Sequence, residues 1–267
     1  MKSVFGDLLI TAAKLEDIDV DIFSDGWVHR LSKNGFQHYT YGYQFDLNSG
    51  VSQQLATDKC AAYELLNHAG LNAVTHRLTT TWVYKNRRWI RLDSQEMISY
   101  HIQNILVNNQ LPLVLKPING TGGHDVVLVK KKSELSKLLT KLIEKYGMVA
   151  VAPFIKAESE TRLYMLDGKC LLAYQKTAPA GEWRFNLSGG AKAKVLKPEK
   201  SIEIMARQAL EVIGLRLGAV DFLNTAKGPV ILEVNSGIML NNFASHGQIE
   251  KDLAVNIYRQ ILQTTFI

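Results

Sequence analysis

The sequence has few cysteines, no long uncharged apolar run and no low-complexity linker. Its two cysteines, Cys60 and Cys170, lie far apart and outside any Cys-x-x-Cys pair, which disfavours a disulfide framework and a structural zinc site. We expect both to be core residues of a protein in the reducing cytoplasm. No apolar run approaches the roughly 18 residues that span a bilayer, so we expect no membrane partner.

The composition that remains is that of a globular protein. The 267 residues are 46% hydrophobic and 21% charged, which fits one or two domains with a substantial core. A net charge of +6 favours an anionic small ligand over bulk nucleic acid. Asp7 interrupts the apolar stretch from Val4 to Ala13, so we interpret the N-terminus as part of the fold rather than as a signal peptide.

The first 50 residues are predicted to be β-rich. Strands are indicated at 20–23, 27–32 and 36–43, and Asn34-Gly35 between the last two is a strong hairpin signal. The alternating tyrosines of the last strand either pack within the hairpin or line a substrate groove: Tyr39, Tyr41 and Tyr43.

Beyond residue 56, helices and strands follow one another irregularly. Helices are predicted at 58–70, 93–106, 133–147, 202–213 and 249–262. Their predicted N-caps are Thr57 or Asp58 for the first, Asp93 for the second and Ser133 for the third. Strands are predicted at 79–84, 89–92, 112–116, 126–129, 148–155, 162–166, 169–175, 217–223 and 229–234. Without a regular βαβ alternation, this order predicts an α+β fold in which antiparallel sheets predominate.

Two segments combine cationic or amide side chains with glycines. Lys116 ends an apolar strand and is followed by the glycine-rich segment 119–123, an arrangement that suits phosphate binding but is also common in purely structural turns. Arg184 and Asn186 alternate by two, so they face the same side if the segment is extended. Taken alone, the segment favours a solvated loop over a binding site.

Acidic side chains also lie in two predicted strands that are otherwise apolar. Asp221 lies in one strand, and Glu233 and Asn235 share one face at the end of the next. If these strands are neighbours, the three side chains form a cluster of hard oxygen ligands suited to Mg²⁺ with nucleotide phosphates. Carboxylates in such strands are costly without a cation, so we interpret them as a metal site.

These motifs occur in a specific order: Lys116-Pro117, Arg184-x-Asn186 with Gly189-Gly190, Val220-Asp221, and Glu233-Val234-Asn235. Over about Thr57 to Asn235, the chain resembles the ATP-grasp superfamily, and within it the carboxylate–amine ligases of the RimK and glutathione synthetase type. The resemblance implies two α+β subdomains that clamp ATP. It assigns 1–55 to a shortened N-terminal segment, 56–150 to the central lid-bearing subdomain and 151–267 to the C-terminal subdomain with the metal site.

The resemblance also implies roles for individual residues. Those expected to contact ATP are Lys59, Lys116, the lid residues Gly120, Thr121, Gly122 and Gly123, the hinge residues Pro153 and Phe154, the ribose-binding Glu160, and Arg184 and Asn186 beside the γ-phosphate. Those expected to hold Mg²⁺, or Mn²⁺ in its place, are Asp221, Glu233 and Asn235. Arg184 is expected to steady an acyl phosphate, and Arg162 to bind the substrate carboxylate.

The chain also departs from the family pattern. Pro153 stands where the family usually has a glutamate, and Ser236-Gly237-Ile238 replaces a Ser-Pro-Gly-like continuation after Asn235. The stretch before the Lys59 helix is shorter than a complete N-terminal α/β domain. These departures leave the acid and the amine unidentified, and whether the acceptor is free or borne on a protein stays open.

The function that the resemblance implies is ATP-dependent amide or peptide bond formation through an acyl phosphate. Two alternatives stay open: a small-molecule kinase on the same scaffold, and a non-catalytic ATP-binding regulatory protein. A homo-oligomer, either a dimer or a tetramer, is also implied.

Overall fold

The computed structural model describes residues 4–91, 94–108 and 110–267. Its helices are α1 (Val4–Lys14), α2 (Gly50–Thr57), α3 (Lys59–His68), α4 (Ser94–Asn108), α5 (Lys132–Tyr146), α6 (Lys200–Ile213), α7 (Asn241–Ala244) and α8 (Gln248–Thr265), with short 3₁₀ turns η1 (Ser24–Gly26) and η2 (Leu187–Gly189). The predicted N-cap Asp93 lies outside the described residues.

The strands within these ranges form antiparallel sheets. They are β1 (Asp19–Phe23), β2 (Val28–Lys33), β3 (Phe36–Tyr41), β4 (Gln44–Phe45), β5 (Arg77–Thr80), β6 (Trp82–Lys85), β7 (Arg88–Arg91), β8 (Leu113–Pro117), β9 (Val127–Val129), β10 (Met148–Pro153), β11 (Ser159–Leu166), β12 (Lys169–Thr177), β13 (Lys192–Val195), β14 (Leu217–Thr225) and β15 (Gly228–Asn235). Every strand pairing within the described sheets is antiparallel, which confirms the predicted α+β fold.

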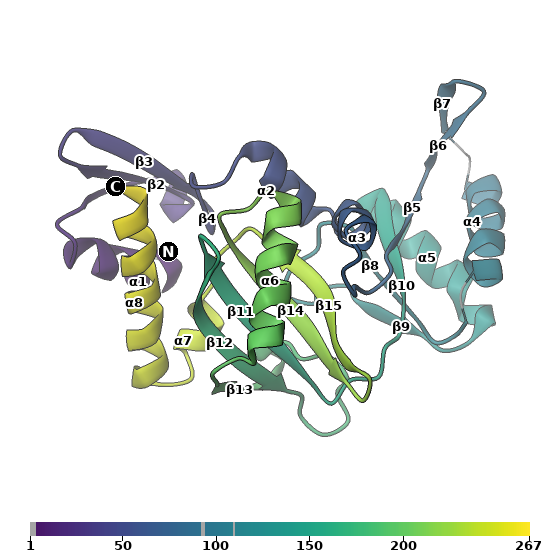
Figure 1. Cartoon of the computed structure of the whole chain (residues 1–267). Coiled ribbons are helices and arrows are strands. Elements are labelled where there is room, and N and C mark those ends of the chain that lie inside the picture. Colours follow the sequence, from purple (N-terminus) through teal and green to yellow (C-terminus); the bar gives the residue numbers. More distant parts are fainter. Residues whose placement is uncertain (1–3, 92–93, 109) are drawn as a thin grey trace.

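Three larger sheets lie along the molecule, with the C-terminal sheet between the N-terminal sheet and the sheet formed by the middle of the chain (Figure 1). The N-terminal sheet has the order β1-β2-β3-β4, the middle sheet β5-β10-β8-β9, and the large C-terminal sheet β13-β12-β11-β14-β15. Strands β6 and β7 pair only with each other, and Figure 1 shows this hairpin projecting from the body.

The predicted turns and most helix ends are confirmed. Asn34 and Gly35 both have positive φ, as the two-residue hairpin turn requires. The Asp58 side chain accepts hydrogen bonds from the backbone N–H groups of Cys60 and Ala61, at 2.9 Å each, and so caps α3. The prediction of Ser133 as an N-cap is wrong, because α5 already begins at Lys132.

The prediction of a β-rich start is only partly right. Strands β1, β2 and β3 form as expected, but α1 and α2 are absent from the sequence prediction. Helix α1 is amphipathic and buries its apolar side at helical spacing: Phe5, Leu8, Leu9, Ala12 and Ala13. These side chains pack with α8, so the N-terminal stretch is part of the main core as predicted.

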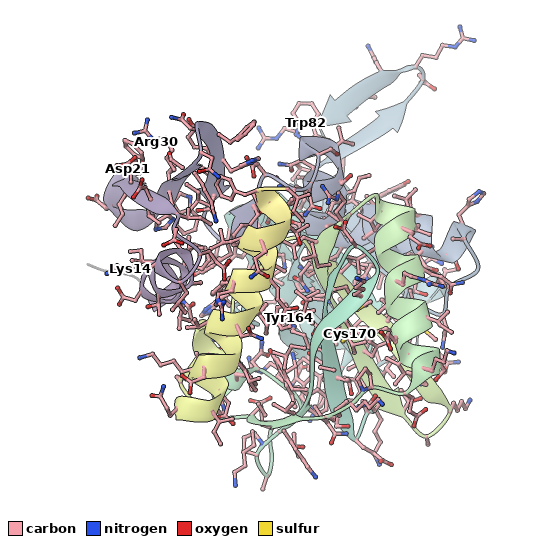
Figure 2. The ribbon with its side chains drawn as sticks, turned by 60° about the vertical axis from the view of Figure 1, so that its left-hand side comes forward. Lys14, Asp21, Arg30, Trp82, Tyr164 and Cys170 are labelled. Atoms are coloured by element: carbon pink, nitrogen blue, oxygen red, sulfur yellow. The ribbon has the colours of Figure 1, made fainter. Side chains whose placement is uncertain are left out.

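The C-terminal sheet is covered on both faces. One face packs Tyr164 and Tyr174 against α1 and α8, and Figure 2 shows Tyr164 beside α8. The other face packs Leu163 and Phe222 against α6 and against α3, which begins with Lys59. A separate core holds α4 and α5 on the middle sheet. The division at residues 55 and 150 stays a prediction, although the helix that begins with Lys59 packs on the C-terminal sheet.

Among the described residues, none of the helices has both the length and the apolarity that crossing a membrane requires. Both cysteines are free, Cys60 buried and Cys170 half-buried against the core, as predicted.

Candidate active site

A cavity of about 730 Å³ lies where the three larger sheets meet. The predicted site residues all line it: Lys59, Lys116, Gly120, Thr121, Gly122, Gly123, Pro153, Phe154, Glu160, Arg162, Arg184, Asn186, Asp221, Glu233 and Asn235. Residues more than 170 positions apart in the sequence therefore meet in one place, and the roles expected for them remain predictions.

The predicted acidic cluster forms because β14 and β15 are neighbours. Asp221 lies opposite Glu233 in the antiparallel register, and Asn235 lies opposite Ala219. The Asn235 amide donates to Asp221 Oδ2 at 3.2 Å and approaches Glu233 Oε1 at 3.5 Å. Val234 points the other way, into the second core. The sequence analysis predicts this cluster only if the two strands are neighbours, and β14 and β15 do pair with each other.

Asp221 lies in a buried network of charges. Arg162 donates to both of its carboxylate oxygens, one at 2.7 Å, and the Lys176 ammonium lies 3.4 Å away. Burial opposes ionisation, yet Arg162 and Lys176 hold the pKa of Asp221 well below its usual range. Glu160 also pairs with Lys176, and burial raises the pKa of that carboxyl to about 7.

The two predicted nucleotide lysines approach the cavity from a helix and a strand, Lys59 from the start of α3 and Lys116 from β8. Lys116, on β8, is buried, and burial lowers the pKa of its ammonium to about 8. The Lys59 ammonium lies 3.7 Å from Glu233 Oε2 and donates to the carbonyl oxygen of Gly120 at 2.7 Å. Lys59 thus contacts both the glycine-rich loop and the acidic cluster.

The glycine-rich loop also contacts the segment that contains Asn186. A Cβ placed on Gly123 would lie 2.5 Å from the Asn186 side-chain oxygen, so only glycine permits this approach. Gly123 has φ +73°, a conformation that also favours glycine. The loop predicted to act as a lid therefore lies against the segment predicted to contact the γ-phosphate.

Arg184 is held beside Glu182. Its Nε and Nη2 donate to the two Glu182 carboxylate oxygens at 3.1 and 2.9 Å, and these bonds lower the pKa of Glu182 to about 2. Its guanidinium lies 5.8 Å from the Trp183 ring centroid. The Arg184 side chain is 41% exposed, so it lines the cavity with access to solvent.

Several cavity residues were missed by sequence reasoning. Lys176 is one of them, although its spacing of two from Tyr174 along β12 indicates that both face the same side. Glu182 is another. Its position two residues before Arg184 is the sequence feature that could have indicated it. Trp27, Tyr41 and Tyr43 also line the cavity, which favours the groove-lining alternative for two of the three tyrosines.

The residues present fit a magnesium nucleotide. Among the described residues, no group of three or more His, Cys, Asp or Glu side chains forms a complete metal cage. Mg²⁺, however, needs only one or two protein carboxylates when phosphate oxygens supply further ligands. Asp221, Glu233 and the Asn235 amide are such donors, and Lys59 and Lys116 suit the phosphates.

Antiparallel sheets that enclose a cavity lined by lysines, arginines and paired carboxylates define a nucleotide-binding clamp. The chain belongs to the RimK-like ATP-grasp domain family, whose model matches residues 56–264. A probable alpha-L-glutamate ligase 2 of Hahella chejuensis is 28% identical over 221 residues, which cover 82% of this chain. The alignments with that protein and with the probable alpha-L-glutamate ligases of Cellvibrio japonicus and Aeromonas salmonicida span 67%, 62% and 59% of those relatives' own lengths.

Two solved structures share the fold. A bifunctional glutathione synthetase from Pasteurella multocida superposes with a TM-score of 0.56 at 12% identity, over 91% of this chain and 41% of that one. A D-alanine–D-alanine ligase from Bacillus anthracis, complexed with ATP, gives 0.54 at 16% identity, over 82% and 71%. The predicted ATP-grasp fold is therefore confirmed.

Proposed function

We propose that the protein is an ATP-dependent, ADP-forming ligase that joins a carboxylate to an amine, on an amino acid or a peptide. The observation that supports this most directly is the meeting of Lys59, Lys116, Arg184 and the Asp221 cluster in one cavity. The names of the relatives, which are probable alpha-L-glutamate ligases, agree with amide bond formation.

The reaction proceeds in two steps. The terminal phosphoryl group of ATP passes to a carboxylate oxygen of the acid, which gives an acyl phosphate and ADP. The amine nitrogen then attacks the acyl carbon, the carbon–oxygen bond to phosphate breaks, and inorganic phosphate leaves while the nitrogen loses a proton. Positioning and charge neutralisation account for most catalysis of this kind.

Each step uses groups that line the cavity. Lys59 and Lys116 bind phosphate oxygens, and the glycine-rich loop supplies backbone N–H groups to them. Arg184 neutralises the charge of the phosphoryl group in transfer. Arg162 orients the substrate carboxylate, and its contact with Asp221 places it beside the acidic cluster.

The metal that this chemistry uses is Mg²⁺, or Mn²⁺ in its place. Asp221, Glu233 and Asn235 are the residues that would hold it by their side-chain oxygens. When bound, the ion would supply positive charge that lowers the repulsion between phosphate oxygens and the incoming carboxylate.

Phosphate release and product mass test this function. The protein is incubated with ATP, Mg²⁺ and a panel of amino acids and dipeptides, and the products are weighed by mass spectrometry. We expect amine-dependent phosphate release and a product lighter by one water than its two substrates. A product heavier by one phosphate group would identify a small-molecule kinase instead, and tight nucleotide binding without turnover on any substrate would favour an ATP-binding regulatory protein.

Two further properties belong to this proposal. We place the enzyme in the cytoplasm, where ATP is supplied and where its free cysteines stay reduced. We also propose that it forms a homodimer or homotetramer. Sedimentation at micromolar concentration tests the assembly, and a monomer alone would contradict it.

A further inference from the structure

One end of the cavity is lined by aromatic side chains of the N-terminal sheet. Trp27 precedes β2, Tyr41 ends β3, and Tyr43 follows it. The Trp27 ring meets both tyrosine rings edge to face, with centroids 6.0 Å from Tyr41 and 6.1 Å from Tyr43. Trp27 and Tyr41 line the cavity while 49% and 65% exposed. We call Trp27, Tyr41 and Tyr43 the aromatic wall.

Backbone contacts hold the aromatic wall in place. The Gly42 N–H donates to the Trp27 carbonyl at 2.8 Å, and a Cβ on Gly42 would lie 2.8 Å from the Trp27 ring. Gly42 has φ +57°, so glycine serves both the turn and the close approach of the indole. The wall is therefore a fixed surface of the cavity rather than a loose loop.

The wall is also joined to the strand end that contains the acidic cluster. The carbonyl of Tyr43 accepts a hydrogen bond from the Ile238 N–H at 2.8 Å. The Gln44 amide donates to Ser236 Oγ at 3.0 Å, and Ser236 directly follows Asn235. A molecule that touches the wall therefore lies close to the end of β15, where we place the metal.

Charge is distributed unevenly around the cavity. Every charged residue that lines it comes from positions 59–233. The N-terminal sheet contributes only the wall, Gly42 and Gln44. The segment after β15, which includes α7, contributes only uncharged residues: Ser236, Gly237, Met239, Asn242 and Phe243. Phe243 stacks on Tyr174 with ring centroids 4.9 Å apart and an interplanar angle of 12°. The lining thus divides by its origin in the chain: residues 59–233 supply the charged part, and the N-terminal sheet with residues 236–243 supplies an uncharged part that contains aromatic rings.

Each part suits a different substrate group. The phosphates and the reacting carboxylate are anions, and the cations that neutralise them all lie in the charged part. The amine substrate needs none of those cations. The wall itself offers no cation to a carboxylate side chain that loses water against it, whereas an apolar or aromatic side chain gains contact area there.

We propose, on the basis of the ligase function proposed above, that the aromatic wall binds the amine substrate and selects an uncharged aromatic or branched aliphatic side chain. The acceptor is then an apolar amino acid, or a peptide whose first residue is one. This preference differs from that of an enzyme that adds glutamate as the amine component, because the glutamate side chain is an anion.

Calorimetric titration tests the side-chain selectivity of the aromatic wall in the absence of turnover. Saturating ADP and Mg²⁺ are present, and the probes are L-phenylalaninamide and the α-amide of L-glutamate. We expect the phenylalanine probe to bind at least about tenfold more tightly, a typical margin for a hydrophobic pocket. Trp27→Ala should abolish this difference, and Trp27→Phe should retain part of it.

Trp82→Ala is the matched control. Trp82 is also 49% exposed, but it lies on the projecting hairpin and does not line the cavity (Figures 1 and 2). It should leave both affinities unchanged. If Trp27→Ala unfolds the protein, Tyr41→Ala serves instead, because that exposed side chain has less buried area to lose. Equal binding of the two probes, or tighter binding of the glutamate probe, would overturn the proposal.

Steady-state kinetics separate the wall from the ligase function. With an amine panel at saturating ATP, we expect the highest kcat/KM for phenylalanine- or leucine-type amines, and Trp27→Ala should raise KM for the amine far more than KM for ATP. Turnover with glutamate as the favoured amine would agree with the proposed ligase activity but contradict the proposed selectivity of the aromatic wall. The opposite outcome is selective binding of the phenylalanine probe while no pair of acid and amine gives an amide. It would support the proposed selectivity of the aromatic wall and contradict the proposed ligase activity.

Discussion

Lys116 is a buried lysine of the cavity whose pKa lies near neutral pH. Burial lowers its pKa to about 8, Lys59 adds to this effect, and Glu233 and Glu160 oppose it. Bound phosphates favour the protonated ammonium, so binding takes up a proton above pH 8. We expect ADP affinity to fall by about fivefold between pH 8 and pH 9, measured by calorimetry.

The Lys116→Arg variant is the control for this prediction. Its guanidinium stays protonated throughout, so any remaining affinity should vary little between pH 7 and 9. If wild type and variant show the same pH dependence, Lys116 is not the titrating group.

Asp221 anchors two cations, and removing its charge should destabilise the fold. Asp221→Asn leaves Arg162 without a buried counter-charge, and we expect a loss of about 3–5 kcal/mol in the free energy of unfolding. Asp21→Asn is the matched control, because Asp21 also pairs with an arginine, Arg30, but is 51% exposed at the rim shown in Figure 2. It should cost less than about 1 kcal/mol. Equal losses in urea titrations would contradict this.

Arg184 should matter for turnover more than for nucleotide binding. Because it is expected to act on charge that develops during phosphoryl transfer, Arg184→Ala should lower kcat by about 10²–10³-fold and weaken ATP binding only in part. Arg207→Ala, on the exposed surface of α6, should leave both unchanged. If Arg184→Ala releases phosphate as fast as the wild type, Arg184 does not have the proposed role in phosphoryl transfer.

At the scale of elements, the contact between the glycine-rich loop and the Asn186 segment makes a prediction. Gly123→Ala would place a methyl group 2.5 Å from the Asn186 oxygen, so the loop should close poorly and KM for ATP should rise. Gly181→Ala is the control, because Gly181 has a similar φ of +83° with open space around it. An equal change in KM for both variants would attribute the effect to backbone strain alone.

Elements also show where sequence reasoning succeeds and fails. The hairpin at Asn34 and Gly35 follows from residues that favour positive φ, so local sequence suffices. Helix α1 was missed although Phe5, Leu8 and the residues that follow have helical spacing. A short apolar stretch interrupted by Asp7 does not by itself distinguish a helix from an extended segment.

At the scale of the whole molecule, the first and last helices share one core. Leu9 of α1 is fully buried against α8, so Leu9→Ala should lower the free energy of unfolding by about 2–5 kcal/mol. Leu15→Ala is the control, because Leu15 is 57% exposed and should change stability by less than about 0.5 kcal/mol. If thermal unfolding shows no difference between the two, the N-terminal helix does not stabilise the C-terminal core.

The sequence by itself determined the residue types of the site and their order. Lys116 before a glycine-rich loop, and Asp221 with Glu233 and Asn235 in apolar strands, are local patterns, because strand alternation alone says which side chains share a face. The α+β class followed in the same way from the succession of helix and strand signals.

Only the tertiary structure decided which residues meet. It paired Asp221 with Arg162 and Lys176, brought Lys59 to the carbonyl of Gly120, and placed Trp27 on the cavity from the far end of the chain. These contacts join positions separated by tens to hundreds of residues. Such positions are brought together by the burial of distant apolar faces in shared cores, which no local pattern records.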